Sequence, residues 1–138
     1  MITSAGLERD VLIVACAISA GIHAALAPGH FAEGTGPGLG FAAAAVLLAG
    51  LAVELTQRPA STLALAGAGA VLAGLVASYA LATTTGLPLL HPDAEPVEGL
   101  ALATKAIEAI GLLAAVHLLW RGRPAVAVTH LQPKGMLT

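Results

Sequence analysis

The sequence predicts an all-α integral membrane protein, a bundle of four transmembrane helices that alternate up and down. Of its 138 residues, 57% are hydrophobic and only 10% are charged, whereas about 25% of a soluble domain is charged. Aromatic residues, which fill many soluble cores, make up only 3%, and 16 residues are glycine. Small residues let helix backbones approach closely inside a bilayer. The composition therefore favours tightly packed helices in lipid.

Four stretches are long and apolar enough to cross the hydrocarbon core, which requires about 20 mostly apolar residues. They are residues 11–27, 39–55, 62–82 and 100–120. We expect them to form one domain over residues 1–121, followed by a cytoplasmic tail over residues 122–138.

The first span also has features of a signal peptide, because a small-residue sequence stands at positions 25–27. However, Pro28 follows that sequence, where it would obstruct cleavage, and Glu8 and Asp10 make the preceding flank non-cationic. We interpret the span as a retained helix. Pro28 and Gly29 are expected to interrupt it before His30.

The basic residues predict the orientation of the bundle. Those outside the spans are Arg9, Arg58, Arg121, Arg123 and Lys134. The loops at residues 28–38 and 83–99 contain no Lys or Arg. The positive-inside rule then places both termini and the turn at Arg58 in the cytoplasm, and both cation-free loops outside. The predicted location is the inner (plasma) membrane.

Ionisable residues within the spans mark a candidate polar site, because charges in lipid usually face a bundle interior or a cavity. Glu98, Lys105 and Glu108 share one face of the fourth span, and Lys105 and Glu108 are one turn apart and can pair. Either the pair only fixes helix register, or a polar cavity leads down from the outer face, and we favour the cavity. By helix rise, His23 and Lys105 both lie roughly 9 Å below the outer face and can meet.

The outer side also gathers possible metal ligands. They are His23, His30, Glu33, His91, Asp93 and Glu95. Imidazole and carboxylate groups bind transition metals such as copper or zinc, although the spacing matches no established signature. The run around His91 equally fits a solvated acidic loop. A haem between His23 and His117 is not expected within one chain, because their depths differ by roughly 20 Å.

Two parts of the chain resemble small four-helix membrane proteins of high-GC bacteria. The first is Gly21–His30, with the pattern Gly-Ile-His-Ala-Ala-Leu-Ala-Pro-x-His. The second runs from Thr83 to Pro88 and through His91-Pro-x-x-Glu-Pro to Glu108. The resemblance covers roughly half of the chain. It implies the four-helix topology and draws attention to the histidines and acids within it, but it supplies no mechanism.

These observations leave two classes of function. In the first, the protein is an accessory subunit of a larger membrane assembly, and its outer cluster binds a metal ion. In the alternative, it is an oligomeric transporter or channel protomer with a polar path past His23, Glu98, Lys105 and Glu108. The expected partners are lipid and other membrane subunits or further copies of the chain.

Other classes are not expected. The net charge of −2 offers no basic surface for nucleic acid. The serines in the spans show no order typical of a Ser-His-acid nucleophile, and the glycines around residues 67–70 lie within a span rather than in a phosphate-binding loop. We therefore expect no independent enzymatic activity.

Overall fold

The computed structural model describes residues 4–87, 94 and 96–122, and these form four helices. They are α1 (Ser4–Glu33), α2 (Thr35–Gln57), α3 (Thr62–Thr84) and α4 (Gly99–Arg121). Each is long and apolar enough to cross a membrane, which confirms the predicted number of such helices. The length and apolar composition of these four helices indicate a multi-pass membrane protein.

Helix α1 is longer than the predicted first span because it continues through Pro28 to Glu33. The expected interruption before His30 is wrong. Proline removes only one backbone hydrogen bond of a helix, and the backbone resumes normal bonding after it, with Gly34 N–H donating to the His30 carbonyl at 3.0 Å. His30 therefore lies on the same continuous helix as His23.

The ends of α1 and α2 are joined by a close contact between Phe31 and Gly38. A Cβ atom at position 38 would lie only 2.8 Å from the Phe31 Cα atom, so no larger residue fits there without a shift. This contact explains why α2 turns back tightly along α1 after a single intervening residue, Gly34.

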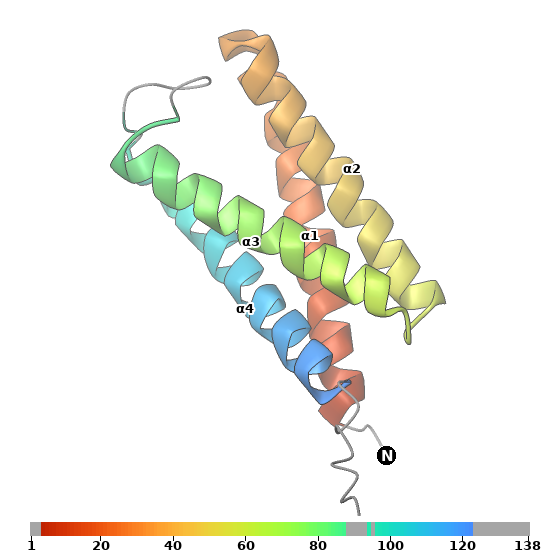
Figure 1. The fold of residues 1–138 in the computed structure, drawn as a ribbon. Coiled ribbons are helices and arrows are strands. Elements are labelled where there is room, and N and C mark those ends of the chain that lie inside the picture. Colours follow the sequence, from red (N-terminus) through yellow and green to blue (C-terminus); the bar gives the residue numbers. More distant parts are fainter. Residues whose placement is uncertain (1–3, 88–93, 95, 123–138) are drawn as a thin grey trace, which may run out of the picture.

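The central element of the bundle is α1, which packs along α2 on one side and against α4 on the other. Helix α3 packs mainly against α4. Although α2 and α3 are joined by the short turn at residues 58–61, they diverge from that turn (Figure 1). Ser61 ends the turn by accepting a hydrogen bond from Ala64 N–H, which caps the start of α3.

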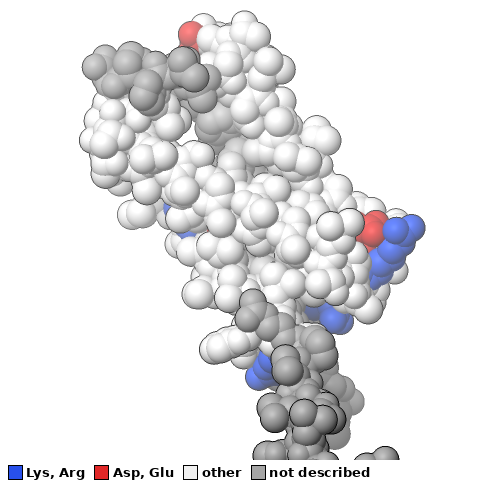
Figure 2. Space-filling model, viewed as in Figure 1, with Lys and Arg blue, Asp and Glu red and all other residues white. Residues whose placement is uncertain are grey.

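Small side chains dominate the core, together with a few leucines. The fully buried apolar residues are Leu12, Cys16, Leu48, Leu55, Ala68, Leu72 and Ala115. Large apolar residues such as Val46, Leu63 and Leu113 instead cover the outside. Most of the face seen in Figure 2 is accordingly uncharged, as suits a surface in contact with lipid tails.

Small residues, Gly67–Ala70 with Gly74 and Ser78, follow one another along α3, and only some of them pack within this chain. Ala68 and Gly69 are buried, and a Cβ atom at Gly69 would be in ordinary contact, 3.6 Å from Ala115 Cβ. Gly74 and Ser78 are exposed, and the Ser78 hydroxyl donates to the Gly74 carbonyl at 2.7 Å. These last two residues thus face outward.

Helix α4 packs closely against α1 and α3 at Gly111. A Cβ atom there would lie 2.8 Å from Ala15 Cβ and 3.1 Å from Leu72 Cδ1. We therefore expect Gly111→Ala to lower the free energy of unfolding by about 1–3 kcal/mol through overpacking. Reversible unfolding of the purified protein in mixed micelles measures this value.

The matched control is Gly74→Ala in α3, where a new Cβ atom would meet nothing within 4 Å. Since alanine favours a helix over glycine by roughly 0.5–1 kcal/mol, this variant should be neutral or slightly more stable. Equal destabilisation by both substitutions would contradict the close approach of α4 at Gly111.

Candidate functional site

Four polar side chains are buried in the described part of the chain, and they come from α1 and α4. They are Ser19, His23, Thr104 and Glu108. In each helix the two residues are four positions apart and so lie on one face. The two faces meet where α1 packs against α4. Ser19, His23 and Glu108 contact one another there, whereas the Thr104 hydroxyl donates to the Leu100 carbonyl within α4 at 2.8 Å.

Glu108 is the centre of this site. Its side chain is 0% exposed and each carboxylate oxygen has a partner. The Ser19 hydroxyl donates to Oε1 at 2.7 Å, and the Lys105 ammonium donates to Oε2 at 2.6 Å. The predicted pairing of Lys105 with Glu108 is confirmed, and the bond from Ser19 links this pair to α1.

His23 adjoins the same carboxylate. Its Nδ1 atom lies 2.9 Å from the Ser19 carbonyl oxygen and 4.0 Å from Glu108 Oε1. A carbonyl can only accept, so Nδ1 carries a proton and donates to it. His23 and Lys105 therefore do meet around Glu108, as their depths predict.

Ser19, His23 and Glu108 are the residue types of a catalytic triad, but their hydrogen bonds differ from those of a triad. The serine hydroxyl donates to the carboxylate at 2.7 Å, while the imidazole Nδ1–H points to the Ser19 carbonyl oxygen. In a triad the histidine would accept the serine proton. The arrangement joins two helices rather than activating the hydroxyl.

Lys105 also contacts α3. Its Nζ atom lies 5.8 Å from the centre of the Tyr79 ring, within the range of a cation–π interaction. The Tyr79 hydroxyl is buried and has no hydrogen-bond partner among the described residues. Nothing in the sequence pattern distinguished this tyrosine, because only tertiary packing brings α3 to Lys105.

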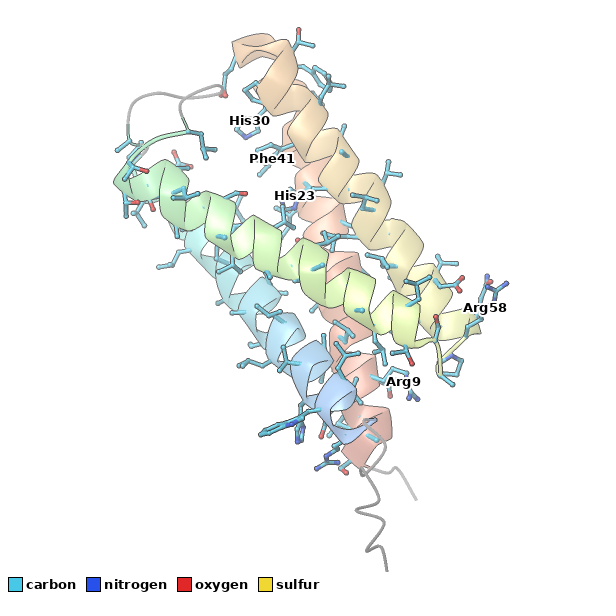
Figure 3. All side chains as sticks on the ribbon, in the orientation of Figure 1. Arg9, His23, His30, Phe41 and Arg58 are labelled. Atoms are coloured by element: carbon cyan, nitrogen blue, oxygen red, sulfur yellow. The ribbon has the colours of Figure 1, made fainter. Side chains whose placement is uncertain are left out.

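A second feature lies above the network, where Phe41 of α2 contacts both histidines of α1. The Phe41 ring stacks on His30 at a centroid distance of 3.7 Å and lies 5.1 Å from His23. Figure 3 shows the three rings one above another along α1 and α2, with Phe41 between the two histidines. Phe41 was not predicted from the sequence, since a lone aromatic residue in an apolar span carries no signal.

His30 is held from two sides. Besides stacking on Phe41, its Nδ1 atom lies 2.8 Å from Glu33 Oε2. A carboxylate accepts the Nδ1 proton, which leaves Nε2 available as a ligand. In both histidines Nδ1 is the nitrogen that makes the hydrogen bond, and the Phe41 ring lies between the two rings.

The other predicted site residues are placed as follows. Glu98 is the exposed residue that precedes α4, and its side chain makes no capping hydrogen bond. His91, Asp93 and Glu95 lie outside the described residues. Within residues 4–87, 94 and 96–122, no three His, Cys, Asp or Glu side chains converge to hold a metal ion.

The polar network ends below Glu108. The next turn of α4 brings Gly111 against Ala15 and Leu72, and Leu12 and Ala115 continue the core. These residues are apolar and closely packed. Among the described residues, the buried polar groups are therefore confined to the half of the bundle that contains the C-terminal end of α1.

At the opposite end, charged side chains pair near the helix termini. His117 Nδ1 lies 3.0 Å from Glu8, and Arg121 Nη1 lies 3.1 Å from the Ser4 hydroxyl. These contacts bring the start of α1 beside the end of α4. Arg58 forms a separate exposed pair with Glu54 at 3.1 Å.

Comparison with known proteins found no match for this chain among protein-family models, curated proteins or solved structures. The resemblance to small membrane proteins of high-GC bacteria therefore stays a prediction.

The buried network makes a prediction about stability. Lys105→Met would leave the Glu108 charge buried with only Ser19 as partner, and removing one member of a buried pair costs about 3–5 kcal/mol. The double variant Lys105→Met/Glu108→Gln removes both charges, and we expect it to regain more than half of that loss. Unfolding in mixed micelles measures all three free energies.

The control is Arg58→Gln, which breaks an ion pair whose arginine is 74% exposed. Exposed pairs contribute less than about 1 kcal/mol, so this variant should unfold like the wild type. A double variant that is no more stable than Lys105→Met would contradict the assigned pairing.

Proposed function

We propose that the chain is an accessory subunit of a larger assembly in the plasma membrane, with a histidine metal site at its outer end. In this proposal the helices run up-down-up-down and both termini are cytoplasmic. Support comes from the distribution of cations: Arg9 and Arg58 lie at the same end of the bundle (Figure 3), where Arg121 also bonds to Ser4. The positive-inside rule assigns that end to the cytoplasm.

The observation that carries the accessory role is the closed character of the buried network. Glu108 is satisfied by Ser19 and Lys105, and apolar side chains follow immediately below at Gly111 and Ala115. A polar route within one copy would stop halfway. The network is thus suited to holding helices together while the outer end contacts a ligand or partner.

The metal proposal rests on His30. Metal-bound histidines usually donate their second ring N–H to a carboxylate, which fixes the ring, and Glu33 accepts in this way at 2.8 Å. Stacking on Phe41 fixes the ring further. His30 would bind through Nε2, with Glu33 orienting it, and His91, Asp93 and Glu95 are the proposed further ligands. Copper or zinc suits this donor set.

A second candidate, an oligomeric transporter, is favoured by one observation. The Lys105 side chain is 15% exposed, so several copies could surround a wet path that touches this ammonium. The two functions predict complexes of different subunit composition. An accessory subunit co-purifies with other polypeptides, whereas a transporter forms a symmetric homo-oligomer. The mass of the complex extracted in mild detergent distinguishes them.

The metal content of gently purified protein tests the first proposal. We expect bound copper or zinc in the wild type, and at least a tenfold loss of affinity in His30→Ala, because a ligand is removed. The matched control is His117→Ala, at the opposite end of the bundle beside Glu8, which should retain the metal. Metal-free wild-type protein, or equal metal content in the two variants, would exclude the site.

Labelling with a membrane-impermeant maleimide tests the orientation independently. A cysteine introduced at Thr35, the first residue of α2, should react in intact cells, whereas one at Ala60, in the turn after α2, should react only after permeabilisation. Native Cys16 is fully buried and should not react in either case. The reverse pattern would overturn the proposed topology without affecting the metal test.

A further inference from the structure

We propose that the groove between the start of α1 and the end of α4 binds one phospholipid, with an acyl chain in the groove and the phosphate at Arg121. This site lies at the end of the bundle opposite His30 and is independent of the proposed metal site. Three properties support it: its lining, its direction and the charge at its mouth.

The groove is open to its surroundings and has mostly apolar walls. Its volume is about 450 Å³, and its apolar lining is Leu7, Val11, Ile110, Leu113 and Ala114. That volume falls within the range of small-molecule sites. Inside a bilayer such a hollow is filled, because side chains that face a void lose their dispersion contacts. The filling group must itself be apolar.

The direction of the groove matches that of a lipid chain. Its α4 wall runs from Ile110 to His117, which is about 10 Å along the helix by its rise. The polar members, Glu8 and His117, pair near the helix ends, where Leu7 also lies, and the other apolar lining residues lie further from these ends. The groove therefore leads from the charged rim into the hydrocarbon, as an acyl chain does below its headgroup.

Arg121 supplies a cation at the mouth of the groove, beside the Glu8 carboxylate that His117 also contacts. Arg121 follows His117 by one turn and its side chain is 51% exposed. Its contacts with Ser4 at 3.1 Å and with Glu8 at 3.8 Å both involve Nη1. A guanidinium has five N–H donors in a fork that fits phosphate oxygens. Further donors are thus available to a headgroup.

Trp120 provides a specific reporter, because it is the only tryptophan in the chain. It follows Leu113 by seven residues and His117 by three, so it lies on the same stripe of α4 as the groove wall. It is 69% exposed. Bromine atoms on an acyl chain in the groove would therefore quench its fluorescence.

The experiment titrates brominated phosphatidylglycerol into the full-length protein in dodecyl maltoside micelles. We expect saturable quenching with one lipid bound per chain. Arg121→Gln should weaken the apparent affinity about fivefold, because this is the contribution to affinity of one cation near a phosphate. Arg58→Gln, at the same end of the bundle but on the turn between α2 and α3, should bind like the wild type. Brominated diacylglycerol, which lacks the phosphate, should bind wild type as weakly as the phospholipid binds Arg121→Gln.

A second pair of variants tests the acyl chain. Leu113→Ala removes a groove wall and should weaken binding of both brominated lipids, whereas Leu63→Ala, 84% exposed on α3, should not. Quenching that rises without saturation, or that is equal in Arg121→Gln and Arg58→Gln, would overturn the proposal. A dimer whose interface shields Trp120 from both lipids would also overturn it and assign the groove to a second copy.

Discussion

The structure depends on the cost of burying one carboxylate. Glu108 is completely enclosed by the bundle, and an isolated charge there would be prohibitively unfavourable. Lys105 supplies the opposite charge from the same helix, and Ser19 supplies a hydrogen bond from α1. Because only one relative position of α1 and α4 gives Glu108 both partners, this requirement selects the register of the two helices. Gly111, one turn further along α4, allows the close approach that this register needs.

The polar groups divide the bundle into two unlike halves. Around and above Glu108, ionisable and aromatic side chains follow one another from Lys105 through His23 and Phe41 to His30. Below it, α1 and α4 pack through small and apolar residues until the charged groups near their ends. The proposed metal site lies in the first half and the proposed lipid site in the second, so the two proposals concern opposite ends of the bundle.

The four spans could be predicted because the free energy of crossing lipid depends on composition and length, which a sequence displays directly. The Lys105–Glu108 pair could also be predicted, because helix geometry brings side chains that are three residues apart close together. The roles of Phe41 and Tyr79 could not, because each acts through a neighbour on another helix. The predicted interruption of α1 at Pro28 was wrong for a different reason. A proline removes one backbone hydrogen bond, and α1 tolerates this loss near its end.

The most direct test of this account is the distance between Ser19 and Glu108 in a lipid bilayer. Solid-state NMR on protein labelled with ¹³C in serine and glutamate reports whether the Ser19 Cβ and Glu108 Cδ nuclei are close. We expect a correlation between them that disappears in Ser19→Ala, because the hydroxyl donates to the carboxylate at 2.7 Å. Absence of that correlation, with the Glu108 carboxylate instead in contact with water or lipid headgroups, would contradict the central role of this buried charge.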